Sequence, residues 1–287
     1  MIRLAFSTNA YSRFTLDEAV ADIAAAGYGG VELIVDRPHL WPAEFSRDHA
    51  EKFRARLDAL GLRISNLNAN CTAGYFRDAP PEPFFEPSLV SPQEHMRADR
   101  LAAIAQTLSI AAWLGASNIS ITSGRLLIPP KEAWRVLVES LKRICGLAEQ
   151  VGQPGQPGGI RIGIETEPAL FIETSAELAE LIGRVGSPLL GANLDLGHVF
   201  VNGESAQQAV SLLPGRIWNV HIEDLPGRKH YHMVPGTGTY DFPAAHAALA
   251  AAGYDRFATV ELYTCSADPG GAARAALPVL QQAGFSR

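Results

Sequence analysis

The sequence is poor in cysteine, and it has neither a long apolar run nor an excess of basic residues. Its three cysteines, Cys71, Cys145 and Cys265, are odd in number and far apart, which argues against a disulfide framework and favours a reducing compartment. No apolar stretch approaches the roughly 20 residues that a membrane-spanning helix needs. The first residues lack the apolar region and the cleavage site of a secretory signal. We therefore expect a cytoplasmic protein that does not enter a membrane.

The charge balance restricts the partners further. The chain has 24 basic and 30 acidic residues and a formal net charge of −6. A nucleic-acid-binding protein normally presents a basic face, so we expect no nucleic-acid partner. The hydrophobic fraction of 47% is ordinary for a globular enzyme and suffices for a sizeable core. A small-molecule substrate is therefore the expected partner.

A short apolar run followed by a helical stretch repeats eight times along the chain. This alternation predicts a parallel sheet with crossover helices. An open, doubly wound sheet is the alternative, but it usually has fewer strands and a glycine-rich first turn, whereas residues 9–13 here read NAYSR. We predict one (β/α)₈ TIM barrel domain over residues 1–287. The candidate strands are 2–7, 30–33, 63–67, 118–122, 161–165, 190–195, 217–222 and 257–261, and the candidate helices are 15–26, 47–60, 91–114, 130–151, 174–185, 205–213, 242–252 and 270–282.

Two longer connections interrupt the pattern. Residues 152–159 (GQPGQPGG) join a helix to the next strand, which places them at the bottom of a barrel as a flexible surface loop. Residues 71–90 follow the third strand and belong to the top. Tyr75, Phe76, Phe84 and Phe85 in this segment either cover a pocket or anchor the loop, and the sequence leaves both interpretations open.

Four consecutive candidate strands end in a side chain that can bind a metal ion. These side chains are Glu165, Asp195, His221 and Glu261, at spacings of 30, 26 and 40 residues. In a barrel the strand ends meet at one mouth. Alone, each residue would be a solvated charge, a helix cap or a core histidine. Three carboxylates in one small space repel one another unless a cation holds them, so we predict a metal site.

The composition of this set favours certain metals. Three carboxylates and one imidazole suit Mn²⁺, Mg²⁺ or Co²⁺, and Zn²⁺ also stays open. A structural zinc site would more often use cysteine, and no cysteine ends a strand of this set. We expect one divalent ion, with Mn²⁺ as the first choice, in a catalytic type of site.

The second half of the chain contains an ordered set of motifs. They are Glu165, LDLGH at 194–198, HIED at 221–224 with Arg228 and PGTG at 235–238, and Glu261 after Val260. This set resembles that of the xylose isomerase-like superfamily, above all its ketose 3-epimerases, hydroxypyruvate isomerases and inosose isomerase-type members. The resemblance extends from the first strand to the last helix. It implies the (β/α)₈ fold, a bound metal that is commonly Mn²⁺, and often a homodimer or homotetramer.

The resemblance also assigns roles. Glu165, Asp195, His221 and Glu261 match the metal ligands by position, and His198 and Arg228 match residues that contact substrate oxygens. The epimerases have a second glutamate six residues after the first ligand, where this chain has Phe171. Either Glu167 or Glu173 can substitute for it. Glu167 has the strand parity of Glu165 and so points into the mouth or is a solvated loop residue.

One branch of the same superfamily consists of apurinic endonucleases with three metals. That branch needs histidine ligands after strands two and three, where this chain has Glu32 and Asn66 to Asn68. We therefore do not expect an endonuclease. His230 and His232 have the spacing of two endonuclease ligands, and for His232 a hydrogen bond to a sugar hydroxyl is preferred to a second metal. Glu223 is either a partner of a ligand or a rim charge.

We expect a metal-dependent isomerase or epimerase of a keto sugar or an inosose-like cyclitol. Glu165 and Glu261 would remove and return the proton on opposite sides of a metal-stabilised enediolate. Loss of a β-hydroxyl from the same intermediate would instead make the protein a dehydratase or lyase. A sugar-binding barrel without turnover is the third hypothesis, disfavoured because the full ligand set is present.

Overall fold

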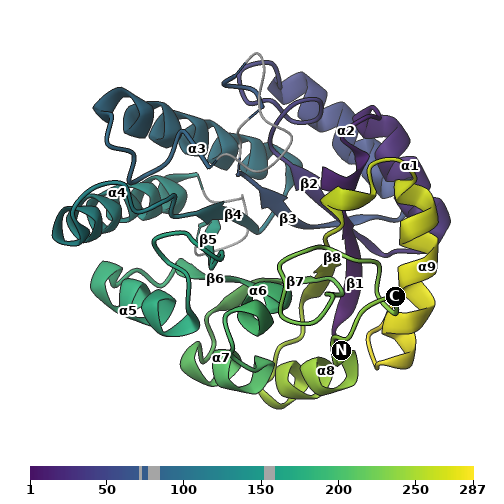
Figure 1. Ribbon diagram of the computed structural model, residues 1–287. Helices are drawn as coiled ribbons and strands as arrows, with labels where there is room; N and C mark the ends of the chain where they lie inside the picture. The colour runs from purple at the N-terminus through teal and green to yellow at the C-terminus, as the bar shows by residue number, and fades with distance from the viewer. Residues whose placement is uncertain (71–72, 77–84, 152–158) are drawn as a thin grey trace.

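Eight parallel strands close into a barrel in the order β1 to β8, with helices around the outside (Figure 1). The computed structural model describes residues 1–70, 73–76, 85–151 and 159–287. The predicted fold is confirmed, and the strand bounds differ from the prediction by at most one residue at either end. The strands are β1 Arg3–Ser7, β2 Gly30–Ile34, β3 Arg63–Asn68, β4 Asn118–Thr122, β5 Arg161–Glu165, β6 Leu190–Asp195, β7 Ile217–Ile222 and β8 Phe257–Val260.

The eight predicted helices are all present, and α3 begins at Glu94 rather than at 91. Three short helices were not predicted: α6 Leu196–Val201 and the 3₁₀ helices η1 Thr8–Tyr11 and η2 Tyr263–Cys265, which all follow the C-terminal end of a strand. These three short helices therefore lie at the mouth of the barrel, where the C-terminal ends of the strands meet. The other helices are α1 Leu16–Ala26, α2 Arg47–Leu60, α4 Pro130–Gln150, α5 Ser175–Val185, α7 Ala206–Leu212, α8 Phe242–Ala251 and α9 Pro269–Gln282.

The capping residues explain why the helices start where they do. The Thr15 side chain accepts a hydrogen bond from the backbone N–H of Glu18, and the Glu18 carboxylate accepts one from the backbone N–H of Thr15. Thr174 and Glu177 form the same capping box at α5. Each cap satisfies backbone donors that would otherwise lack a partner and contributes about 1 kcal/mol. These local signals confirm the sequence-based helix starts.

The interior of the barrel contains many polar side chains. In most TIM barrels it is filled by branched apolar residues. Here Asn118 donates to Asn66 Oδ1 at 2.7 Å, and Asn66 donates to Ser120 Oγ at 2.7 Å. On the other side of the barrel, Asn219 donates to Asn193 Oδ1 at 2.8 Å. Buried amides with satisfied hydrogen bonds hold the strands in one arrangement below the mouth.

Both ends of the chain meet at the N-terminal end of the barrel (Figure 1). Strand β1 pairs with β8 to close the sheet. Ser286 then pairs with the start of β1, accepting from Leu4 N at 2.7 Å and donating to Ile2 O at 2.9 Å. The last residues of the chain are therefore part of the closed structure.

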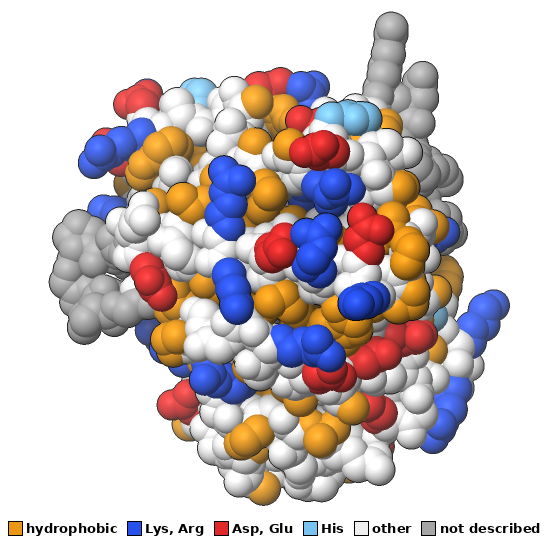
Figure 2. Space-filling model, turned by 90° about the vertical axis from the view of Figure 1, so that its left-hand side faces the viewer, with side chains coloured by type: hydrophobic (Ala, Val, Ile, Leu, Met, Phe, Trp, Pro, Cys, Tyr) orange, Lys and Arg blue, Asp and Glu red, His pale blue; other side chains and the backbone are white. Residues whose placement is uncertain are grey.

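The outer surface over α4 and α5 mixes charges of both signs with scattered apolar side chains (Figure 2). Its groove is lined by residues such as Lys131, Trp134 and Arg184, with the Arg184 guanidinium 4.5 Å from the Trp134 ring centre. This groove lies outside the helices and is separate from the barrel mouth. None of the helices in the described ranges is both long and apolar enough to cross a bilayer.

The two long connections lie largely outside the described residues, including most of the predicted 152–159 insert and Phe84. In the described part of the 71–90 segment, Asp36 accepts from Ala73 N and Gly74 N at 2.8 Å each. The Tyr75 ring packs edge-on against Trp41, with ring centres 5.1 Å apart. This part of the segment is thus anchored to the connection after β2, as the anchoring interpretation expects.

Candidate active site

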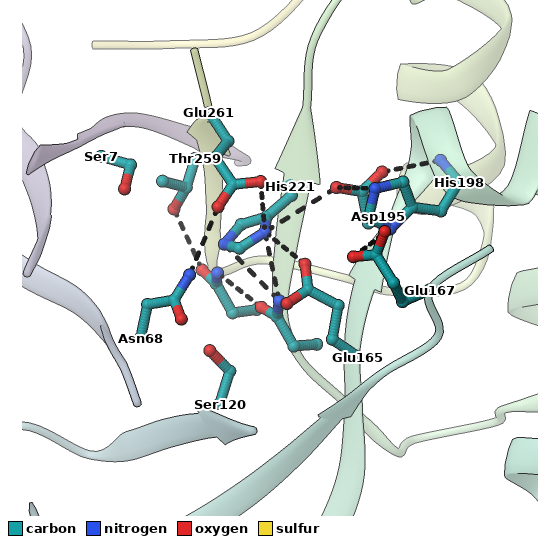
Figure 3. A network of polar contacts seen from close by, with 12 residues as sticks. Ser7, Asn68, Ser120, Glu165, Glu167, Asp195, His198, His221, Thr259 and Glu261 are labelled. Atoms are coloured by element: carbon teal, nitrogen blue, oxygen red, sulfur yellow. Dashed lines mark hydrogen bonds and ion pairs between the residues drawn. The ribbon is translucent and has the colours of Figure 1, made fainter. Parts of the chain in front are cut away.

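The carboxyl ends of β5 to β8 bring Glu165, Asp195, His221 and Glu261 into one cluster. One donor atom from each residue lies within 4.8 Å of every other, and all four side chains are buried. Figure 3 shows Glu165 and Glu261 on either side of the His221 ring. The strand-end positions predicted from the sequence therefore meet at one point of the mouth.

Amide side chains hold one oxygen of each glutamate and leave the other directed into the cluster. Glu261 Oε1 accepts from Asn9 at 2.8 Å and from Asn68 at 3.3 Å. Glu165 Oε2 accepts from Asn70 at 3.1 Å. The other oxygens, Glu165 Oε1 and Glu261 Oε2, lie 2.7 Å and 3.4 Å from Nδ1 of His221. Each glutamate thus has one fixed oxygen and one oxygen directed at the centre.

Asp195 is also fixed through one carboxylate oxygen, but here the donor is a backbone N–H instead of an amide side chain. It is the last residue of β6 and the N-cap of α6, where Oδ1 accepts from the backbone N–H of His198 at 2.8 Å. No hydrogen bond from the described residues reaches Oδ2, although this atom is buried. Oδ2 lies 3.8 Å from His221 Nδ1. A buried carboxylate oxygen without a donor is costly unless a cation meets it.

These observations fit a divalent cation bound in the cluster. Three carboxylate oxygens and one imidazole nitrogen converge, and each residue is fixed through an atom other than its donor. The donor set is mostly oxygen, which suits a hard or borderline divalent ion. Glu165, Asp195, His221 and Glu261 can therefore hold one such ion together.

The titration behaviour of the cluster without a cation shows how strongly the carboxylates are crowded. Burial, reinforced by the charges of Glu261 and Asp195, raises the pKa of Glu165 to about 8. Burial would lower the pKa of His221, but Glu32, Glu261 and Glu165 raise it well above its ordinary value. Against burial, His221 also keeps the pKa of Glu261 below normal. A proton on His221 or Glu165 thus offsets part of the negative charge that the carboxylates bring together.

A second group of histidines lies next to the first cluster. His198 donates from Nδ1 to the carbonyl oxygen of Thr166 at 2.9 Å, and His232 donates from Nδ1 to that of Glu261 at 2.8 Å. Their Nε2 atoms are therefore left as possible acceptors, and both face Nε2 of His230, at 3.0 and 3.3 Å. Burial lowers the pKa of His198 to about 4, so this ring is a neutral acceptor.

The two other residues predicted to contact the substrate, Glu167 and Arg228, lie in different surroundings. Glu167 is buried beside this group, with Oε2 3.7 Å from His198 Nδ1 and Oε1 3.7 Å from His230 Nδ1. Burial, together with the charge of Glu165, raises its pKa. Arg228 instead lies exposed at the rim, with its guanidinium 5.3 Å from the ring centre of Phe200.

The structure also places Phe171, which stands where the epimerases have their second glutamate, and the two glutamates that can substitute for it. Phe171 packs edge-on against Trp134, with ring centres 5.3 Å apart. Glu173 accepts from Ala169 N at 2.9 Å and so serves the connection before α5. Glu167, rather than Glu173, lies near the cluster. Glu223 is buried as well, and burial with the charge of Asp195 raises its pKa.

The residues that hold the cluster from behind were not predicted from the sequence. Glu32 on β2 lies with Oε2 only 2.6 Å from His221 Nε2 and is fully buried. Asn9, Asn68 and Asn70 likewise hold the glutamates. The signal for Glu32 was a single charge within the apolar strand sequence GVELI, since charged residues are almost never fully buried unless paired.

A family model described as xylose isomerase-like TIM barrel matches residues 20–283. The chain belongs to this family. Fructoselysine 3-epimerase from Shigella flexneri is 24% identical over 264 residues, covering 90% of this chain and 88% of the relative. Inosose dehydratase from Clostridium perfringens is 20% identical over 264 residues, covering 86% and 82%.

The fold is also that of D-psicose 3-epimerase from Clostridium cellulolyticum H10, solved with D-tagatose. The TM-score is 0.77 at 18% sequence identity, and the alignment covers 99% of this chain and 100% of that one. Relatives of this chain are thus enzymes named for reactions on sugars and cyclitols.

Proposed function

We propose that the chain, as one barrel domain, is a divalent-metal-dependent isomerase or epimerase of a keto sugar or cyclitol. The observation that supports this most is the convergence of four donor atoms at the mouth, each on a side chain fixed through another atom. The buried Oδ2 of Asp195 is one of these donors and lies 3.8 Å from His221 Nδ1.

Glu165, Asp195, His221 and Glu261 would hold the ion. When bound, a divalent cation makes a carbon acid beside a carbonyl easier to deprotonate by balancing charge that develops on the oxygen. The four residues come from neighbouring strands of one wall, so the rest of the mouth is left for the substrate.

Glu165 and Glu261 would transfer the proton. They lie on either side of His221 (Figure 3), so a substrate carbon between them has a carboxylate on each face. Each carboxylate would use its inward oxygen for the ion and would offer a lone pair of its amide-held oxygen to the proton. Removal by one glutamate and return by the other inverts the carbon or, at the neighbouring carbon, moves the carbonyl.

The neighbouring histidines and Glu167 would bind the sugar hydroxyls. His198 and His232 each donate from Nδ1 to a backbone carbonyl oxygen, and their Nε2 atoms would accept from a hydroxyl. Glu167, whose pKa burial raises, can donate from its protonated form. Arg228 reaches the substrate only from the rim. Polar groups at fixed positions of this kind give selectivity for a polyol-like substrate.

A dehydratase or lyase is the second candidate function, and the inosose dehydratase relative favours it. The same proton removal next to a carbonyl allows a β-hydroxyl to leave as water. The two functions differ in their products, because only the dehydratase loses water. A third possibility, sugar binding without turnover, predicts no exchange of substrate protons.

The test is an exchange experiment in D₂O with a panel of keto sugars and inososes and added Mn²⁺, followed by NMR. We expect deuterium at the carbon next to the carbonyl, with an epimer or isomer as product. The matched control is His221→Ala, which removes a donor without adding charge. A product that has lost water supports the dehydratase, and binding without exchange of any substrate contradicts both enzymes.

A further inference from the structure

Glu32 is a fully buried carboxylate behind the cluster, and the proton chemistry described above does not use it. We propose that Glu32 is the positioning residue of His221: it accepts a hydrogen bond from Nε2–H and thereby leaves the Nδ1 lone pair for the bound cation. This inference rests on the proposed function. It adds a residue on β2 to a site whose donors all come from β5 to β8.

The backbone of β2 and β3 is shaped to place this carboxylate. The register of the two strands shifts between Val31 and Glu32, so that Val31 lies opposite Ile64 but Glu32 lies opposite Asn66. Ser65 is the extra residue of this bulge. A bulge redirects side chains and is typical of positions next to active sites. It brings Glu32 level with an amide that can hold it.

Three donors meet at the same oxygen of Glu32. Oε2 accepts from Asn66 Nδ2 at 2.8 Å and from Asn219 Nδ2 at 3.4 Å. It also lies 2.6 Å from His221 Nε2. Two amide N–H groups already point at Oε2, and in the proposed tautomer Nε2–H of His221 is the third donor to this oxygen. The amides fix the carboxylate, and the carboxylate fixes the ring.

This arrangement decides which nitrogen of His221 is available. With the proton on Nε2, the neutral ring has its lone pair on Nδ1, the atom that faces Glu165, Asp195 and Glu261. A histidine ligand held by a carboxylate has a fixed tautomer and a more basic donor nitrogen. Without Glu32, the ring would divide between two tautomers and two orientations.

A purely structural role does not account for the burial of this charge. A carboxylate in the core costs several kcal/mol unless it is paired, and an apolar residue of similar volume usually packs as well or better. The neighbours of Glu32 on β2, Val31 and Leu33, are apolar and buried. The only cationic partner within ion-pair distance among the described residues is His221.

The test measures the Kd for Mn²⁺ by chelator competition in wild-type protein, Glu32→Gln and Glu32→Leu. We expect Glu32→Leu to weaken binding about 100-fold and Glu32→Gln about 10-fold, which is the usual range for lost partners of a ligand. Glutamine retains an acceptor oxygen for Nε2–H but loses the charge. Partial rescue by glutamine therefore distinguishes positioning of the ring from bulk packing.

Ser65→Ala is the matched control. Ser65 is buried on the neighbouring strand and its Oγ lies 3.1 Å from Thr259 Oγ1, so this variant loses one barrel hydrogen bond without touching His221. We expect it to lower the unfolding midpoint but to leave the Kd unchanged. Equal Kd values in wild-type protein and both Glu32 variants would overturn this inference alone. A wild-type protein that binds no divalent ion would overturn the proposed function as well.

A measurement on the wild-type protein decides the matter even if the Glu32 variants do not fold. The Zn²⁺-loaded protein is diamagnetic, so long-range ¹H–¹⁵N spectra of labelled histidine report the tautomer of His221. We expect the proton on Nε2 and the metal on Nδ1. A proton on Nδ1, with Nε2 as the ligand, contradicts the inference.

Discussion

At the scale of single residues, the two glutamates of the site are each fixed through one carboxylate oxygen. Asn9 and Asn68 hold one oxygen of Glu261, and Asn70 holds one oxygen of Glu165. The other oxygen of each glutamate points into the cluster. Fixed donors of this kind reduce the reorganisation that a reaction requires. The roles of the two glutamates can therefore be tested by changing only the charge.

We expect Glu165→Gln and Glu261→Gln to reduce turnover by about 10²-fold or more, the usual scale for a lost acid or base. Metal binding should weaken only partly, because glutamine keeps an oxygen ligand. One variant should still exchange the substrate proton with D₂O, since only the returning acid is missing, and the other should not. Near wild-type turnover of both variants at saturating Mn²⁺ would place the base elsewhere, with Glu167, His198 and Glu223 as the next candidates.

The pH dependence of metal binding follows from Glu165. Burial raises its pKa to about 8 in the metal-free protein, and the ligand must be ionised to bind a cation. A raised pKa means that protons compete below this value, so the affinity for Mn²⁺ should rise with pH between 6 and 8. Calorimetry in buffers of different ionisation enthalpy measures the protons released. In Glu165→Gln this rise should be smaller, and an equally steep rise would exclude Glu165 as its source.

The sequence predicted the four donors because each ends a strand, and strand ends of a barrel meet in space. It could not predict Glu32 or Asn9, because their roles depend on contacts with β7 and β8, far away in the chain. The contact of Arg228 with substrate stays a prediction: its guanidinium lies over Phe200 at the rim, from where it would reach a bound substrate.

At the scale of secondary structure, the short helix α6 starts at a residue of the candidate metal site. Asp195 ends β6 and caps α6, so one carboxylate fixes a helix with Oδ1 and faces the cluster with Oδ2. The eight longer helices followed from apolar periodicity and capping residues, whereas α6 is too short for such a pattern. The helix starts at Asp195, which was predicted from the sequence as a metal ligand.

This double role predicts that Asp195→Asn and Asp195→Ala will differ in stability but agree in metal binding. Asparagine is as good an N-cap as aspartate, while alanine costs about 1 kcal/mol. The unfolding free energy, measured with urea in the presence of a chelator, should therefore fall only in Asp195→Ala. Mn²⁺ binding should be strongly weakened in both. Equal stability of the two variants would show that the cap contributes nothing.

At the scale of the whole molecule, the cluster connects four strands that are distant in sequence. A cation bound there stabilises the folded state by mass action, by about 2.7 kcal/mol at a concentration 100 times the Kd. We expect Mn²⁺ to raise the Tm of the wild-type protein and chelation to reverse this increase. His221→Ala should show no increase. Full activity after exhaustive chelation would contradict the metal site.

The pairing of Ser286 with the first strand has a practical consequence. Both chain ends lie at the end of the barrel opposite to the mouth, so they can be fused, tethered to a sensor surface or linked to each other without covering the site. Because Ser286 is hydrogen-bonded to the first strand, a fused segment should be added after Arg287. Deletion of the last residues would remove this pairing. A circularly permuted chain with new ends in an exposed helix-to-strand connection should keep the whole cluster.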